Sequence, residues 1–273
     1  MDALTLAETT RRISALLAAG QSAHVVTLNP ELVMRARRDR GLAQIVRAAS
    51  LVTADGMGAV WALRLAGQRI PERVTGVDLA FALAEDAAAT GQPLFLLGAA
   101  PGVAQMTAMA LTQRLPGLRV AGVWDGSPHP RDDAEAVARI RASGARLALV
   151  AYGAPAQELW IARNLPALPG VVALGVGGAF DMLAGRIPRA PHWMRAAGLE
   201  WLYRLARQPW RWRRMLALPR FAALASMAAL RVRLTQSPDA GILAVRDSAQ
   251  TAGAREERAV ERDDDPVEPQ HIT

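Results

Sequence analysis

Six short apolar runs alternate with longer Ala- and Leu-rich stretches over residues 1–185, and this alternation most limits how the chain can fold. Apolar runs closed by Gly, Asp or Asn are typical of parallel strands that are buried on both faces. Their alternation with helical stretches predicts an α/β fold with a Rossmann-like, doubly wound, mostly parallel sheet. Strands are expected at 24–28, 50–54, 93–97, 119–123, 147–152 and 171–176, and helices at 30–40, 56–66, 79–90, 102–115, 132–143 and 157–165.

Charge divides the chain into three parts. Residues 1–185 hold 17 Arg and 15 acidic residues, residues 186–233 hold 11 Arg and a single acid, Glu200, and residues 234–273 hold 4 Arg and 9 acidic residues. Four of the 7 Trp lie between positions 193 and 212. We therefore predict a Rossmann-like domain at 1–185, an Arg- and Trp-rich helical appendage at 186–234 and a disordered acidic tail at 235–273. The basic block indicates an anionic partner: a phosphate group, a nucleic acid or a membrane surface.

Composition excludes several kinds of site. The chain has no Cys, and therefore neither a disulfide framework nor a zinc–thiolate site, and its 4 His lack metal-ligand spacing. An Asp-x-Asp pattern occurs only in the acidic tail, and a chain without Lys has no Walker-type phosphate loop. No apolar run reaches the roughly 18 residues of a membrane-spanning helix, and the N-terminal pattern is not that of a signal peptide. We expect no metal and no cofactor.

Polar residues follow the first two predicted strands, where doubly wound sheets bind their ligands. Thr27 and Asn29 end the first strand. Asn29 suits a helix cap before Pro30, and alternatively its amide and the Thr27 hydroxyl suit a sugar or a base. Asp55 ends the second strand and is suited either to cap the next helix or to act as a general base toward a hydroxyl.

Two further loops have a structural and a functional interpretation each. Arg73 and Asp78 form either an ion pair beside a glycine turn or a site that orients a substrate. Gly98 begins a glycine turn into a helix, whose N-terminal N–H groups suit a phosphate. The GxGxxG pattern of dinucleotide sites is absent there, so this turn is weak evidence for a nucleotide.

The last two glycine loops follow the fifth and sixth strands. Gly153 makes a turn before Gln157 and Glu158, a polar pair at a helix start where the acid alone would compensate the dipole. The glycines of 175–178 serve either tight packing or the approach of a ligand. The candidate substrate-binding residues are therefore Thr27, Asn29, Arg73, Asp78, Gly98, Gly153, Gln157 and Glu158.

These motifs, in this order, resemble those of the WecG/TagA/CpsF glycosyltransferases, glycosyltransferase family 26. The resemblance covers about residues 5–230. The matching stretches are TLNP at 27–30, DGMG at 55–58, RVTGVD at 73–78, GAPAQE at 153–158, GGAFD at 177–181, RAP at 189–191 and GLEW at 198–201, followed by Arg204, Pro209, Arg211, Arg213 and Arg214.

The resemblance implies an inverting, metal-independent hexosyltransferase that forms β-linkages. It implies transfer from a UDP-sugar donor to a polyprenyl-diphosphate-linked sugar acceptor, in the synthesis of a cell-surface polysaccharide such as an exopolysaccharide or a teichoic-acid-like polymer. By the same resemblance, Asp55 is the catalytic base, Thr27 and Asn29 lie near a substrate sugar, and the family's Gln corresponds to Gln157. The implied diphosphate-binding residues are Arg204, Arg211 and Arg214, with Arg213 as an alternative in register.

The resemblance also gives the basic appendage a mechanistic reason. Fixed arginines supply the positive charge that a departing diphosphate needs, where Asp-x-Asp enzymes use a metal. We expect the appendage to complete the site of the 1–185 catalytic domain and to lie on the cytoplasmic membrane surface, with its Trp side chains at the interface. The protein is then cytoplasmic and peripheral on the inner face of that membrane. The alternative is a helix packed on its own domain with its arginines in solvent.

Two other function classes compete with a transferase. A nucleic-acid-binding protein would use the Arg/Trp segment, but this leaves unexplained the polar residues at the ends of five strands. A dinucleotide-dependent oxidoreductase would share the fold class, but the first strand is not followed by GxGxxG. We therefore expect no nucleic acid partner, and an Ala-rich surface leaves a homo-oligomer possible.

Overall fold

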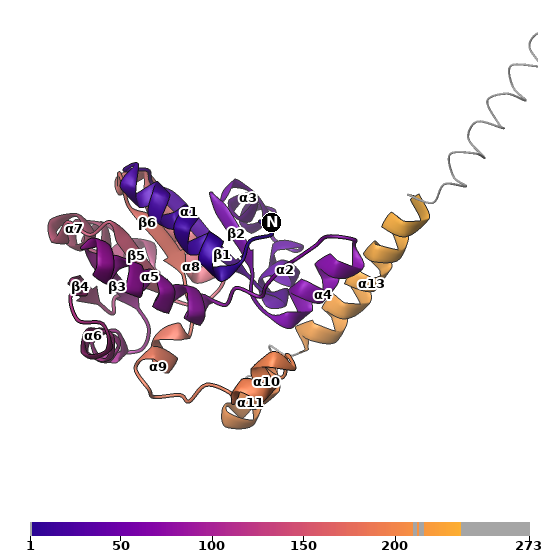
Figure 1. The fold of residues 1–273 in the computed structure, drawn as a ribbon. Coiled ribbons are helices and arrows are strands. Elements are labelled where there is room, and N and C mark those ends of the chain that lie inside the picture. The colour runs from indigo at the N-terminus through magenta and orange to yellow at the C-terminus, as the bar shows by residue number, and fades with distance from the viewer. Residues whose placement is uncertain (1, 210–211, 213–215, 236–273) are drawn as a thin grey trace, which may run out of the picture.

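The protein is built on one six-stranded sheet, in a computed structural model that describes residues 2–209, 212 and 216–235 (Figure 1). The strand order is β2-β1-β6-β5-β3-β4, and all neighbouring strands are parallel. The predicted doubly wound sheet is thus confirmed, with strand ends within about one residue of those expected. The strands are β1 (Ala23–Leu28), β2 (Leu51–Ala54), β3 (Leu94–Gly98), β4 (Val120–Trp124), β5 (Leu147–Ala151) and β6 (Val172–Gly175).

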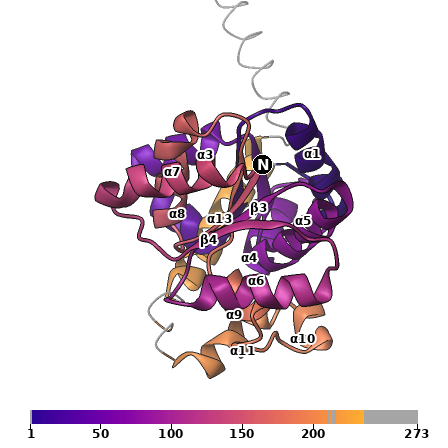
Figure 2. The same cartoon turned by 90° about the vertical axis from the view of Figure 1, so that its left-hand side faces the viewer.

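Helices cover both faces of the sheet, and Figure 2 shows the two layers on opposite sides of it. One layer holds α1 (Leu6–Ala18), α5 (Gly76–Thr90), α6 (Val103–Arg114) and α9 (Ala179–Leu183). The other holds α2 (Pro30–Ala36), α3 (Arg40–Ala48), α7 (Asp133–Ser143) and α8 (Ala156–Asn164). The neighbouring strands β1 and β6 are followed by helices on opposite faces, α2 and α9. Their carboxyl ends are therefore a switch point of the kind where α/β proteins bind ligands.

One predicted helix is wrong. The stretch at 30–40 is not a single helix, because α2 ends at Ala36 and α3 begins at Arg40. Asp39 separates the two: its backbone is extended, and its Oδ1 accepts a hydrogen bond from the Leu42 N–H at 3.0 Å. A residue that caps a helix in this way lies outside it, and the Ala- and Arg-rich composition of the stretch does not reveal the break.

After β6 the described part of the chain contains helices and no strand. These helices are α9, α10 (His192–Ala196), α11 (Glu200–Arg207) and α13 (Ala217–Thr235), which lies against α2 and α4 (Met57–Leu65). A Cβ added at Gly58 of α4 would lie 3.0 Å from Cγ of Pro30 in α2, a tight contact, and 3.7 Å from the ring of the buried Phe221 in α13, an ordinary van der Waals distance. Within the described residues, no helix combines the length and the apolar character needed to cross a bilayer. The acidic tail predicted from 235 lies, apart from Thr235, outside these residues.

The central strand β5 supplies a test of the core. Leu149 is fully buried on that strand, so Leu149→Ala is expected to lower the free energy of unfolding by about 2–5 kcal/mol through lost burial and a residual cavity. The matched change Met109→Ala, on a side chain of α6 that is 56% exposed, is expected to stay within about 0.5 kcal/mol. Denaturant unfolding measures both values, and an equal loss of unfolding free energy in the two variants would contradict the burial of Leu149 in the core.

Candidate functional site

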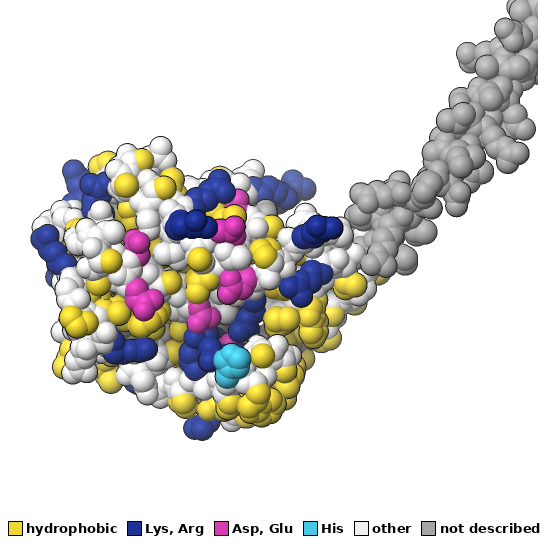
Figure 3. Space-filling view, viewed as in Figure 1, with side chains coloured by type: hydrophobic (Ala, Val, Ile, Leu, Met, Phe, Trp, Pro, Cys, Tyr) yellow, Lys and Arg dark blue, Asp and Glu magenta, His cyan; other side chains and the backbone are white. Residues whose placement is uncertain are grey.

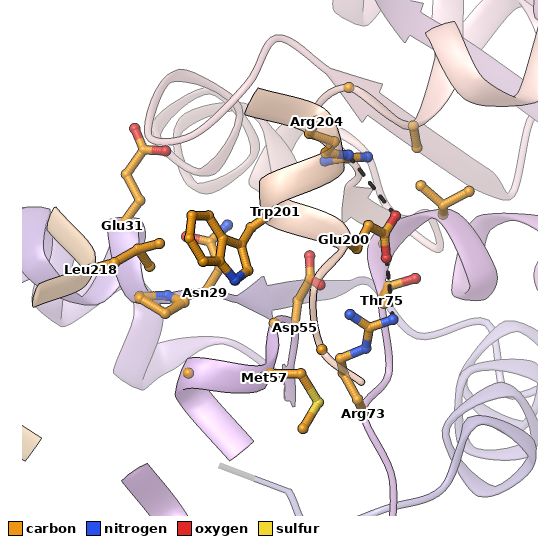
Figure 4. Close-up of a pocket in the computed structure, with 18 of the residues that line it drawn as sticks. Asn29, Glu31, Asp55, Met57, Arg73, Thr75, Glu200, Trp201, Arg204 and Leu218 are labelled. Carbon is orange, nitrogen blue, oxygen red and sulfur yellow. Dashed lines mark hydrogen bonds and ion pairs between the residues drawn. The ribbon is translucent and has the colours of Figure 1, made fainter. Parts of the chain in front are cut away.

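A cavity of about 190 Å³ opens at the carboxyl ends of β1, β2 and β6 (Figure 4). The turns after β1 and β2, the loop before α5, the loop after β6 and helix α11 all contribute to its wall. Four residues that the sequence had singled out line it together: Asn29, Asp55, Arg73 and Arg204. Other lining residues include Glu31, Met57, Thr75, Gly178, Glu200, Trp201 and Leu218.

Asp55 directly follows β2, and its side chain is not used as a helix cap. The N-cap of α4 is Gly56, whose φ of 89° is one that L side chains rarely adopt, and no side chain caps this helix. The Asp55 N–H donates to the Leu28 carbonyl of β1 at 2.9 Å, which fixes its backbone at the sheet edge. The carboxylate instead points into the cavity, between Arg73 and the Glu200–Arg204 pair (Figure 4).

The environment of Asp55 changes its acidity. Burial raises the pKa of the Asp55 carboxyl from 3.8 to about 6, although the charges of Arg204 and Arg73 and the Gly76 backbone lower it. The negative charge of Glu200 adds to the rise. A carboxylate with a pKa near 6 is ionised at neutral pH and basic enough to accept a proton, which is the property required of a general base.

Glu200 holds the arginines of the site in place. This residue is only 8% exposed, and its Oε2 accepts a hydrogen bond from Arg73 Nη2 at 3.2 Å. Its Oε1 lies 3.9 Å from Nε of both Arg204 and Arg189. One buried carboxylate from α11 is therefore surrounded by three guanidinium groups, whose positive charges offset part of the cost of its burial. Glu200 was not among the residues predicted for the site, although it is the single acid of the basic block.

Asn29 and Thr27 occupy different places. Asn29 caps α2, since its Oδ1 accepts from the Leu32 N–H at 2.9 Å, and the same residue lines the cavity. The capping interpretation is thus confirmed and does not remove the residue from the site. Thr27 is buried, and its hydroxyl donates to the Gly175 carbonyl of β6 at 3.1 Å. A sugar-binding role for either residue stays a prediction.

Asp78 lies on α5, outside the residues that line the cavity. It shares two hydrogen bonds with the Thr75 cap of α5 and forms a two-point ion pair with Arg189. Burial by itself would raise the pKa of Asp78, but the hydrogen bonds from Arg189 and Thr75 hold it below its usual value. The pair of Asp78 and Arg189 joins α5 to the start of the appendage. Arg73, which the sequence suggested as the partner of Asp78, binds Glu200 instead.

Gln157 and Glu158 are buried on α8 and do not line the cavity. Gln157 Oε1 accepts from the N–H groups of Gly153 at 3.1 Å and Gly177 at 2.8 Å, so it joins the loops after β5 and β6. Glu158 accepts from Gln157 at 2.9 Å and lies 2.7 Å from Nε2 of the buried His24. The polar pair at this helix start therefore positions the loop that leads to Gly178 in the cavity wall.

The remaining predicted residues lie elsewhere. Gly98, at a φ of 94°, faces Tyr152, whose ring would lie 2.8 Å from an added Cβ. The helix N-terminus beyond it already binds an acid, because the Gly102 N–H donates to Asp125 at 2.8 Å. Arg211 and Arg214 lie outside the described residues. Among those that the structure describes, no group of three or more His, Asp or Glu could hold a metal ion.

The comparison with known proteins explains this combination of motifs. The model of the family described as "Glycosyl transferase WecG/TagA/CpsF family" matches residues 1–236. The chain belongs to this family. An N-acetylglucosaminyldiphosphoundecaprenol N-acetyl-beta-D-mannosaminyltransferase of Bacillus subtilis is 34% identical to it over 198 residues, 72% of this chain and 77% of that enzyme. An enzyme of the same name from Bacillus spizizenii is 35% identical over 201 residues, 74% of this chain and 77% of its own length.

Membership of the WecG/TagA/CpsF family makes the protein a glycosyltransferase and confirms the resemblance drawn from the sequence. A glycosyl transfer needs a group that takes a proton from the attacking hydroxyl and positive charge beside the leaving group. The cavity offers both, as Asp55 and as the arginines arranged around Glu200.

Two substitutions should move the acidity of Asp55 in opposite directions. Glu200→Gln removes a negative neighbour and is expected to lower the pKa of Asp55 below about 6, whereas Arg204→Gln removes a positive neighbour and is expected to raise it. Carbon-13 NMR titration of the labelled Asp carboxyls measures both shifts, with the exposed Glu85→Gln as a control. Shifts in the same direction would refute the electrostatic arrangement.

Ionised Asp55 should also destabilise the fold. Its pKa is higher in the folded state than the 3.8 of the free side chain, so stability falls as pH rises from about 4 to about 6, and the whole cost persists above pH 6. Asp55→Asn removes this cost. The substitution is expected to raise the free energy of unfolding by up to about 3 kcal/mol at pH 8 and by almost nothing at pH 3.5. Urea unfolding at the two pH values measures the difference, and a gain that is the same at both would be inconsistent with it.

Proposed function

We propose that this protein transfers an N-acetylmannosaminyl residue from a UDP-sugar to a polyprenyl-diphosphate-linked N-acetylglucosamine, with inversion and without a metal ion. The names of its two relatives support the choice of sugars and of a lipid diphosphate acceptor. The mechanism rests on the position of Asp55. Its carboxylate does not cap α4, has a pKa of about 6 and faces Arg73 and Arg204 in the cavity.

The first half of the reaction falls to Asp55. The acceptor hydroxyl oxygen attacks the anomeric carbon of the donor from the side opposite the diphosphate, and Asp55 takes the hydroxyl proton as the new bond forms. Attack from that side inverts the configuration, so an α-linked donor gives a β-linked product. The cavity is smaller than the roughly 300–1,000 Å³ of a drug-sized site, which suits the reacting groups rather than two whole substrates.

The second half is departure of the diphosphate. As the bond from the anomeric carbon to the phosphate oxygen breaks, negative charge grows on UDP, and among the described residues Arg204 and Arg73 are the cations that line the cavity. Their guanidinium groups are held by Glu200 before any substrate binds, so little reorganisation is needed. Arg211 and Arg214, which follow on the same appendage, complete this cluster in the proposal.

The acceptor also sets where the reaction takes place. A lipid diphosphate must be reached at a membrane, and Trp193, Trp201 and Trp212 of the appendage are all exposed. We propose that this face lies on the inner surface of the cytoplasmic membrane and that the protein is peripheral there. A role in nucleic-acid binding is not part of the proposal, because both relatives are sugar transferases.

Turnover with and without EDTA tests the proposal. With a panel of UDP-sugars and an N-acetylglucosaminyl-diphosphate lipid in detergent, the wild type is expected to release UDP undiminished by EDTA. Asp55→Asn is expected to lower kcat by about 10²–10⁴-fold, and Glu85→Gln, a carboxylate outside the cavity, to leave it unchanged. Activity that requires a divalent ion would overturn the metal-free mechanism, and an active Asp55→Asn enzyme would remove Asp55 as the base.

The pH profile gives a second test. Since only ionised Asp55 accepts a proton, kcat/KM is expected to fall tenfold per pH unit below about pH 6. The residual activity of Asp55→Asn should lack this acid limb. A profile that is flat between pH 5 and 7 in the wild type would contradict the assignment, because the group that limits activity would then titrate elsewhere.

A further inference from the structure

A second, apolar depression adjoins the cavity. It has a volume of about 490 Å³, which is within the range of small-ligand sites, and it lies between α4, α11 and α13. Although the appendage is rich in Arg, none of the lining residues within the described part of the chain is charged. Its lining residues are Met57, Gly58, Trp61, Ala62, Leu65, Ala197, Gly198, Leu199, Trp201, Leu218, Pro219, Phe221, Ala222, Ala225 and Ser226.

The groove follows one face of each of two neighbouring helices. On α4, Met57, Trp61 and Leu65 recur every four residues, and on α13 the lining residues 218, 221, 222, 225 and 226 have the same helical spacing. The lining includes small residues such as Gly58 and Ala222 and the large indole of Trp61, which is 57% exposed. The face from Met57 to Leu65 is about 12 Å long, at 1.5 Å per residue.

The groove and the cavity share part of their walls. Met57, Gly58, Gly198, Trp201 and Leu218 line both. At one end the shared wall leads to Asp55 and Arg204, and at the other end it leads along α4 to Leu65, which is 43% exposed. One molecule can therefore occupy both only if it is polar and anionic at one end and apolar at the other.

Three large exposed apolar side chains, Trp61, Leu65 and Trp201, line this groove. Most of the large ones that the structure describes belong to α4 or to the chain after α9, and Figure 3 shows hydrophobic side chains gathered over this junction. The two exceptions, Met106 and Met109, lie on α6. An apolar patch that is both concave and joined to a polar site indicates a ligand-binding surface.

We propose that this groove binds the isoprenoid chain of the acceptor, in the units that directly follow its diphosphate. The inference rests on the proposed function, in which the acceptor sugar lies at Asp55 and its diphosphate near Arg204. The wall that the groove shares with the cavity favours this occupant over a membrane acyl chain or a second copy of the protein, neither of which has to reach the reacting groups. The catalytic domain, through α4, then contacts the lipid together with the appendage.

The test compares acceptors that differ only in the length of the lipid chain. The wild type is expected to use a long polyprenyl acceptor with a higher kcat/KM than one with a short alkyl chain in the same detergent. Trp61→Glu places a charge in the groove and is expected to reduce this preference about tenfold or more. Met109→Glu places the same charge on an equally exposed side chain of α6 and should keep the wild-type preference. Ala222→Trp, which fills the groove without a charge, should act as Trp61→Glu does.

The outcomes separate the two proposals. An unchanged preference in both Trp61→Glu and Ala222→Trp would overturn the groove and leave the transferase intact. The groove is also overturned as an acceptor site if Trp61→Glu and Ala222→Trp keep the acceptor preference and abolish only binding to phospholipid vesicles. The same holds if they abolish only a dimer seen by light scattering. If the wild type uses neither acceptor, the proposed function fails. The groove is then tested separately by measuring the binding of geranylgeranyl diphosphate in a titration. About tenfold weaker binding to Trp61→Glu than to Met109→Glu would support the groove, and equal binding would overturn it.

Discussion

The buried carboxylate of Glu200 is the contact through which the site is assembled. It comes from α11, whereas Arg73 comes from the loop before α5, so the pair joins the appendage to the sheet domain. A carboxylate this buried is tolerated only because Arg73, Arg189 and Arg204 surround it. Arg189 in turn holds Asp78 of α5. The contacts that join the appendage to the sheet domain are therefore the same ones that hold the cations beside Asp55.

This arrangement also sets the acidity of Asp55. Two positive charges and one negative charge act on it in addition to burial, and the balance leaves the pKa at about 6 rather than at the value of a free side chain. A more basic surrounding would stabilise the anion and weaken it as a base. Glu200 thus has two effects, since it fixes the arginines and moderates their influence on the residue that takes the proton.

The surface around the site changes from polar to apolar over a short distance. Arg204 and Trp201 leave the same helix three residues apart, one toward the cavity and one at the border of the groove. A substrate that joins a sugar, a diphosphate and a hydrocarbon chain presents the same succession of chemistry. The lining residues of α4, α11 and α13 match the hydrocarbon part of such a substrate.

Local sequence determined the strands, most helices and the position of Asp55, because buried strands and the turns that close them are encoded by neighbouring residues. The break between α2 and α3 at Asp39 was not predicted, because a helix cap depends on one side chain within a helical composition. Only the tertiary structure decided which polar residues meet. It directed Gln157 and Glu158 to the interior, paired Asp78 with Arg189, and brought Glu200 to Arg73 across 127 positions of sequence. The physical reason is that a buried charge requires a partner, and the fold rather than the sequence spacing determines which charge is near enough to be one.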